Sequence, residues 1–271
     1  MEPHQILACI ELVIYCTLLA PVAFCTYHYL RKKQTAWLYL NVFTLAKIIG
    51  PAIFLALSHQ PPPSRSLQIA AQVLYQIALG PLLAAALSFA NTSSKPNDAT
   101  PRFPLGQTTN RTPLKLLLRL IQPIIIVGLV LGIVSGVDRA PTSSGLVDED
   151  KYDRGVTLSK VSAALFFVAL AGITLGVALL WKERKSLPTV LYYITTCMVV
   201  ALPCLLLPVV YSVGGAANAR SAMDAAQPSR FDILRGDWVI YFFLGFLPQL
   251  LVLGVYTACG CLAWVQERGM R

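Results

Sequence analysis

Charged residues are scarce in this chain of 271 residues: 13% are Asp, Glu, Lys or Arg, whereas 56% are hydrophobic. A water-soluble domain normally carries about 25% charged residues, so the composition excludes a chain whose whole surface faces water. The hydrophobic residues come in long blocks, and a block of about 20 apolar residues lets an α-helix cross the hydrocarbon core of a bilayer. Inside lipid the backbone must satisfy its own hydrogen bonds, so these blocks predict membrane-spanning helices.

Motifs for common enzyme chemistry are also missing. The three histidines, His4, His28 and His59, lie at block ends and do not converge as a zinc site requires. The sequence has no Gly-x-Ser-x-Gly nucleophile pattern and no glycine-rich phosphate loop. The acidic run 148–150 resembles a metal-diphosphate site, but its polar surroundings favour a solvated loop. We therefore expect no metal ion and no other cofactor.

Loops contain no cysteine, which excludes the loop-stapling disulfides of small secreted domains. All seven cysteines lie within apolar blocks, where cysteine usually serves as a small packing residue. They are Cys9, Cys16, Cys25, Cys197, Cys204, Cys259 and Cys261.

Seven apolar blocks predict an all-α membrane protein, a bundle of seven transmembrane helices that forms a single domain over residues 1–271. Polar segments between them are predicted loops, such as the one with Pro61-Pro62-Pro63, because three consecutive prolines cannot lie in a helix interior. The segment 137–156 is predicted to be one of these polar loops. The predicted helices cover residues 5–30, 36–57, 67–90, 114–137, 158–181, 190–213 and 238–265.

The distribution of basic residues predicts the orientation. With the N-terminus outside, inside segments carry thirteen of the 22 Lys and Arg residues and outside segments carry eight. The two short basic turns, at 31–33 and 182–185, both fall inside, and short loops count most in this rule. We predict an outside N-terminus and a cytosolic C-terminus. The net charge of +9 is thus an orientation signal in loops and does not indicate nucleic-acid binding; the expected partner is the lipid bilayer.

Two glycosylation patterns conflict with this orientation. Asn91-Thr92-Ser93 and Asn110-Arg111-Thr112 match the acceptor triplet, yet both lie in the third connection, which the charges place inside. Such triplets often arise by chance, so Asn91 and Asn110 are weak candidates for a glycoprotein. The sequence does not distinguish the plasma membrane from the endoplasmic reticulum.

Small residues indicate how helices pack. Gly128, Gly132 and Gly136 recur every four residues in the fourth block, and Gly172 and Gly176 do so in the fifth. This spacing forms a groove that another helix can approach closely. We expect the fourth and fifth helices to pack there, with a homo-oligomer through the first three glycines as the alternative.

Two ionisable residues, Glu11 and Lys47, lie deep within apolar blocks. Each charge costs about 2.5–3.5 kcal/mol at the membrane centre, so each needs a partner inside the bundle. Side chains lean toward the N-terminus of their own helix, which moves these two apart, and the sequence leaves open direct pairing or separate contacts with hydroxyls, carbonyls or water. A polar set completes this candidate ligand site: Asn41, Gln72, Tyr75, Gln76, Gln122 and Gln249.

Several hydrophobic segments resemble a fungal seven-helix family that is defined only as a domain of unknown function. They are IELVIY at Ile10–Tyr15, AWLYLNVFTLAKIIGP at Ala36–Pro51, ALGPLLAAAL at Ala78–Leu87, RLIQPIIIVGLVLGIVSG at Arg119–Gly136 and SKVSAALFFVAL at Ser159–Leu170. The resemblance implies a fungal membrane protein, similar in some members to products of secondary-metabolite gene clusters. It implies no established activity.

The sequence leaves two functional hypotheses and disfavours a third. A non-enzymatic, receptor-like or accessory protein that handles an apolar metabolite fits a bundle without catalytic motifs. An intramembrane enzyme such as a terpenoid cyclase is the alternative, with Glu11 as its catalytic acid. A transporter is disfavoured because no inverted repeat is visible. A light-driven rhodopsin is disfavoured as well, because the last block has no Lys to hold retinal.

Overall fold

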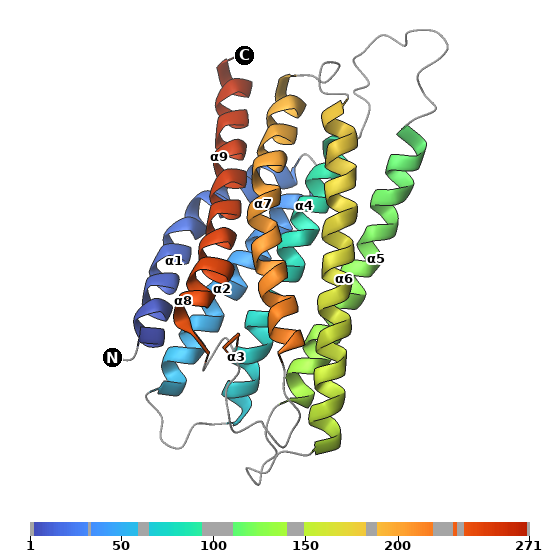
Figure 1. The fold of residues 1–271 in the computed structure, drawn as a ribbon. Helices are drawn as coiled ribbons and strands as arrows, with labels where there is room; N and C mark the ends of the chain where they lie inside the picture. Colours follow the sequence, from blue (N-terminus) through green and yellow to red (C-terminus); the bar gives the residue numbers. More distant parts are fainter. Residues whose placement is uncertain are drawn as a thin grey trace.

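A computed structural model describes residues 3–31, 34–58, 65–93, 111–139, 149–182, 189–218, 230–231 and 236–269. Within these ranges all regular structure is helical, and seven segments are long and apolar enough to cross a membrane. The predicted all-α, seven-helix architecture is therefore confirmed, and the chain is an integral multi-pass membrane protein. The two termini lie at opposite ends of the bundle (Figure 1), which we call the N-terminal end and the C-terminal end.

Five of the seven spans are single helices. They are α1 (Pro3–Leu30), α2 (Ala36–Ser58), α5 (Arg111–Asp138), α6 (Glu149–Lys182) and α7 (Thr189–Ala217). The third span is divided into α3 (Arg65–Ile77) and α4 (Leu79–Ser93), and the last into α8 (Trp238–Ile240), the π-helix η3 (Tyr241–Phe246) and α9 (Leu247–Gly269).

Proline explains both divided spans. A proline has no N–H for the carbonyl four residues earlier, and its ring collides with that carbonyl. Pro81 disrupts the bond to Ile77, the residue at which α3 ends. Pro248 likewise disrupts the bond to Leu244, which lies inside η3. The other spans remain helical through their prolines, which are Pro21, Pro51, Pro123, Pro203 and Pro208.

The sequence prediction was wrong at the start of α6. The segment 149–156, predicted as part of a polar loop, is helical, and Glu149 and Asp150 form the first turn of α6. Acidic side chains stabilise this position because the helix dipole places partial positive charge at the N-terminus. The acidic run is thus partly a helix start, while Asp148 lies outside the described residues.

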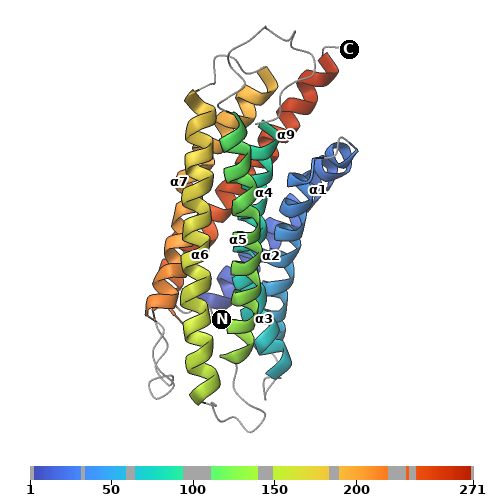
Figure 2. The same cartoon turned by 90° about the vertical axis from the view of Figure 1, so that its right-hand side faces the viewer.

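The glycines of α5 pack inside the chain. Gly128 faces Phe166 of α6, Gly132 faces Ser162, and Gly136 faces Val73 of α3. The Ser162 hydroxyl also donates a 2.6 Å hydrogen bond to the carbonyl of Gly128. Figure 2 shows α5 lying along α6 for most of its length. The expected contact between the fourth and fifth spans is therefore present; the homo-oligomer stays a prediction, and its proposed surface faces helices of the same chain.

The core of the bundle is built around α4. Most of its side chains are buried, and it contacts α2, α5, α6 and α7. By contrast, large hydrophobic side chains such as Val13, Phe167 and Leu262 are exposed on the outer helices. In a bilayer these exposed side chains face lipid, whereas the charged residues Glu11 of α1 and Lys47 of α2 are buried.

A buried charged cluster joining three spans

The sequence of α1 directs Glu11 into the bundle. The buried residues of this helix include Leu7, Glu11, Tyr15, Val22 and Cys25, which recur at the three- and four-residue spacing of one helix face. Glu11 lies among hydrophobic side chains on that face. The side chain is therefore buried by its place in the helical repeat, and its exposed fraction is 0%.

Lys47 occupies the equivalent position on α2. Leu40, Thr44, Lys47 and Pro51 are buried along one face of this helix, and the exposed fraction of Lys47 is 2%. A charge removed from both water and lipid needs a charged or hydrogen-bonding partner, because isolated burial is costly.

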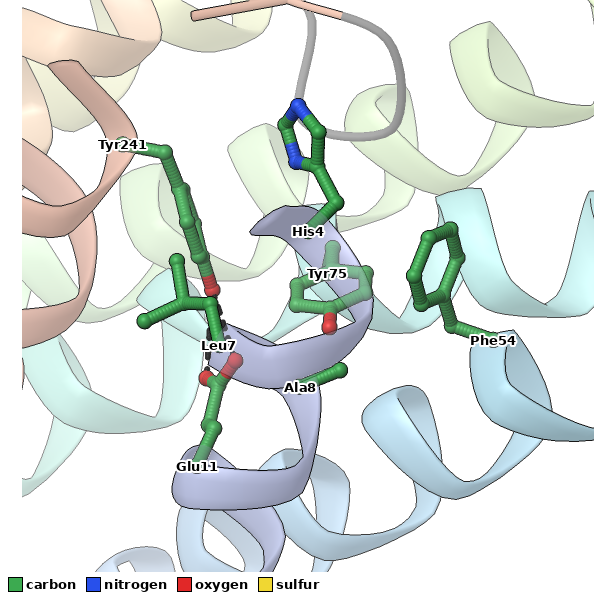
Figure 3. Close-up of a pocket in the computed structure, with 7 residues that line it drawn as sticks. All are labelled: His4, Leu7, Ala8, Glu11, Phe54, Tyr75 and Tyr241. Atoms are coloured by element: carbon green, nitrogen blue, oxygen red, sulfur yellow. Dashed lines mark hydrogen bonds between the residues drawn. The ribbon is translucent and has the colours of Figure 1, made fainter. Parts of the chain in front are cut away.

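The two charges meet directly, and Tyr241 closes the contact. Lys47 Nζ lies 3.0 Å from Glu11 Oε1 and 3.3 Å from the hydroxyl of Tyr241. That hydroxyl lies 3.1 Å from each carboxylate oxygen of Glu11. Lys47 can donate to both partners while Tyr241 donates to Glu11, so the three groups form a closed, charge-assisted network. Figure 3 shows Tyr241 and Glu11 converging from different helices.

The direct pair settles the alternative that the sequence left open. Side chains on these two antiparallel helices are expected to lean in opposite directions, which would offset the two charges along the bundle, yet Lys47 Nζ and Glu11 Oε1 lie 3.0 Å apart. The lysine spans this offset because its charge sits at the end of a flexible four-carbon stem. Helix geometry alone underestimates that reach.

Aromatic rings surround the ammonium group. Lys47 Nζ lies 5.4 Å from the ring centroid of Tyr75 and 5.6 Å from that of Tyr241. Both distances permit a cation–π attraction, which strengthens when the charge is desolvated. The rings of Tyr75 and Tyr241 also pack edge to face with centroids 6.0 Å apart. Tyr75, a member of the predicted polar set, therefore belongs to the site.

A small cavity lies beside Glu11. It is lined by His4, Leu7, Ala8, Glu11, Phe54, Tyr75 and Tyr241 (Figure 3), and its volume is about 10 Å³. This volume accommodates about one water molecule. His4 Nε2 lies 2.9 Å from the carbonyl oxygen of Gly236, so α1 also contacts the start of the last span here.

Tyr241 is the first residue of η3, the π-helical segment. The backbone N–H of Leu247 donates to the carbonyl of Phe242, five residues earlier. Such wider turns are rare, and they are frequent at functional sites. The sequence contains a signal for disruption in Gly245 and Pro248 but none that selects Tyr241. The sequence did not identify Tyr241 as a site residue, because its phenol lies in an apolar segment. It did not identify His4 either, because the three histidines do not converge as a zinc site requires.

The remaining predicted site residues lie elsewhere. None of Asn41, Gln76, Gln122 and Gln249 lines the cavity beside Glu11. Gln122 is exposed on α5, whereas Gln76 lies near Gly136 of α5. The buried amide oxygens of Gln76 and Gln249 have no hydrogen-bond partner among the described residues.

Three further predicted positions have limited structural context. Asn91 is half-buried in the last turn of α4, at the C-terminal end of the bundle. Asn110 and the side chain of Gln72 lie outside the described residues. Glycosylation therefore remains a prediction.

The sequence matches the profile of a domain of unknown function, DUF7702, over residues 1–266. The chain belongs to this family. No curated protein matches the sequence and no solved structure matches the fold. The match to DUF7702 itself assigns no activity to this chain.

Proposed function

We propose that the protein is a non-enzymatic, receptor-like membrane protein in which the Glu11–Lys47–Tyr241 cluster controls a change of helix packing. The observation that carries this proposal is the position of Tyr241. Its hydroxyl contacts both buried charges, and its backbone begins the π-helical segment of the last span. The cluster thus ties α1 and α2 to the described span that contains the π-helical segment.

Two properties make this junction suited to switching. Removing one partner of a buried ion pair is costly, because the other partner is then left as an uncompensated charge. A π-helical turn can convert to an α-helical turn by changing hydrogen-bond register, which rotates the residues on either side relative to each other. Receptor function requires such an element with two discrete arrangements. In this proposal the ion pair holds one arrangement until a ligand favours the other.

An apolar groove supports an apolar metabolite as the ligand. The groove has a volume of about 540 Å³ and is lined by side chains of α6 and α7, with Thr174 as the most polar of them. Binding sites for small molecules commonly measure about 300–1,000 Å³ and are predominantly apolar. A metabolite dissolved in the bilayer could reach this groove without crossing water. Some members of the fungal family that the sequence resembles are similar to products of secondary-metabolite gene clusters, which favours a pathway intermediate or product as the ligand.

Mass spectrometry of small molecules that co-purify with the protein in mild detergent tests this proposal. We expect a defined apolar compound with the wild type and its reduced recovery with Glu11→Gln/Lys47→Met, since the ligand binds one arrangement better than the other. Glu149→Gln/Lys151→Met makes the same two changes at exposed positions of α6 and should retain the compound. Bulk phospholipid alone in all three samples would contradict a ligand-handling role and make the buried charges structural.

The rival is an intramembrane enzyme with Glu11 as acid. The observed cavity beside Glu11 holds about one water, whereas a terpenoid precursor needs several hundred cubic ångströms. Glu11 also accepts hydrogen bonds from Lys47 and Tyr241, so it is positioned as an acceptor. Turnover of a prenylated substrate in microsomes, abolished by Glu11→Gln, would support the enzyme instead.

A further inference from the structure

Four of the seven cysteines form two pairs near the C-terminal end of the bundle. Cys259 and Cys261 lie on α9, on either side of Gly260. Cys261 Sγ lies 3.8 Å from Cys25 Sγ on α1. Cys259 lines the same small cavity as Cys197 on α7. Both pairs therefore join different helices, which packing of isolated thiols does not require.

The surroundings of the first pair hold α1 and α9 together closely. The Tyr29 hydroxyl, one turn beyond Cys25, donates a 2.9 Å hydrogen bond to the carbonyl of Gly260. Nearby, the rings of Phe24 and Trp264 pack edge to face with centroids 5.3 Å apart. These contacts between α1 and α9 thus hold the two sulfur atoms opposite each other.

Metal binding explains this arrangement poorly. The described residues contain no group of three or more His, Cys, Asp or Glu side chains that could hold an ion. Structural zinc takes four ligands and catalytic zinc three from the protein, whereas each cysteine pair supplies two. Two opposed thiols without further ligands are suited to oxidation to a disulfide.

We propose that Cys25 and Cys261 form a reversible disulfide between α1 and α9 when a peroxide is the oxidant. The sulfur atoms must approach from 3.8 Å to about 2.05 Å, the length of an S–S bond. Side-chain rotation on two neighbouring helices can supply such a displacement. In the predicted orientation this end faces the cytosol, where thiols are kept reduced and disulfides are usually redox-sensing. The half-buried Cys261 is the more accessible of the two thiols.

Hydrogen peroxide accepts the two electrons that disulfide formation releases. The Cys261 thiolate attacks one peroxide oxygen, the O–O bond breaks, and the leaving hydroxide takes up the thiol proton as water. The resulting sulfenic acid is attacked by Cys25, which forms the S–S bond and breaks the S–O bond. The departing hydroxide takes the Cys25 proton as a second water. Two thiols lose two electrons in total, and one hydrogen peroxide gains them.

The second pair makes a built-in comparison. Cys197 and Cys259 line a cavity of about 40 Å³, bounded by aromatic rings that include Trp37, Phe89 and Tyr256. The two thiols of α9 therefore have different neighbours. Cys261 faces Cys25, and Cys259 shares this cavity with Cys197. Trypsin separates them, because Cys25 lies in peptide 1–31, Cys197 in 186–220, and both α9 cysteines in 236–268.

Peptide mapping of the full-length protein in lipid nanodiscs tests the proposal. The protein is treated with hydrogen peroxide, its free thiols are alkylated, and tryptic peptides are analysed by mass spectrometry. We expect peptide 1–31 linked to peptide 236–268, with Cys9, Cys16 and Cys259 alkylated. Its mass should be about 2 Da below the sum of the two peptides carrying those three alkyl groups and a free thiol at Cys25 and at Cys261. A thiol reductant should restore the separate peptides.

Single substitutions identify the sulfur atoms. Cys261→Ala and Cys25→Ala should each abolish the 1–31/236–268 link, whereas Cys259→Ala and Cys16→Ala should retain it. A link that persists in Cys261→Ala would overturn the assignment. Its absence in oxidised wild type would overturn the proposal too, whether both thiols stay reduced or are oxidised singly. Neither the wild-type measurement nor Cys259→Ala depends on folding of the Cys25 or Cys261 variants.

Discussion

Helix α1 meets the last span at two places, and the two junctions are built from different chemistry. Near the N-terminal end, Glu11 contacts Lys47 and the hydroxyl of Tyr241. Near the C-terminal end, Cys25 faces Cys261, and the Tyr29 hydroxyl donates to a backbone carbonyl. The first junction depends on charge, and the second depends on close packing, neutral hydrogen bonds and thiols.

Because their chemistry differs, the two junctions should respond differently to substitution. Buried opposite charges are interdependent, because removal of one leaves the other without compensation. Neutral contacts are lost one at a time, each at a modest cost. The charged junction should therefore respond sharply to single substitutions, whereas the neutral junction should respond in small steps and be open to chemical modification.

The largest expected effect comes from Lys47→Met. This change leaves the carboxylate of Glu11 buried without its cation, which should destabilise the protein by about 3–5 kcal/mol. The measurement is thermal unfolding in detergent, followed by the loss of monodisperse protein on size-exclusion chromatography. Glu11→Gln/Lys47→Met removes both charges and should be more stable than Lys47→Met alone. A double variant as unstable as the sum of both single variants would show that the two charges are not coupled.

Tyr241→Phe should have the next largest effect. It removes one hydroxyl that contacts both charges, and hydrogen bonds to charged groups contribute about 1.5–3 kcal/mol. Tyr256→Phe is the matched control in the same span, because its buried hydroxyl has no hydrogen-bond partner among the described residues. We expect this control to leave unfolding in detergent nearly unchanged. Equal destabilisation by both variants would mean that the Tyr241 hydroxyl adds nothing beyond ring packing.

The two junctions also differ in how far the sequence predicts them. Glu11 and Lys47 stand out because a charge within an apolar block needs a partner. Tyr241 does not, since a tyrosine in such a block is as compatible with simple packing as with a polar contact. Its role depends on the π-helical register, which is a property of the folded span next to Pro248. The charged members of a site are thus visible in the sequence, but its neutral member requires the structure.

For the cysteines the limit is similar. Their position in apolar blocks predicts small packing residues, but it carries no information on which helices become neighbours. The seven spans follow from block length alone, whereas the contact of α1 with α9 joins segments more than 200 residues apart. Helix order along the chain does not determine that contact.

Gly260→Ala tests close packing at the neutral junction. A Cβ at this position would collide with the indole ring of Trp37, and such overpacking typically costs about 1–3 kcal/mol. Gly254→Ala is the matched control in α9, since a Cβ there meets no atom within 4 Å. The control should be neutral or stabilising by up to about 1 kcal/mol, because alanine favours helix over glycine. Thermal unfolding of the two variants in one detergent gives the comparison, and equal stability would exclude a role for Trp37 packing.

Tyr29→Phe should have the smallest effect and sharpens the contrast with Tyr241→Phe. Both variants delete one hydroxyl from a tyrosine that links α1 to the last span, but the acceptor differs. The Tyr29 hydroxyl donates to the neutral carbonyl of Gly260, so its loss should cost about 0.5–1.5 kcal/mol. The decrease in melting temperature should therefore be smaller than for Tyr241→Phe under identical conditions. If Tyr29→Phe were the more damaging change, the neutral junction would hold α1 more strongly than the charged one, and the charged cluster could not control how these helices pack.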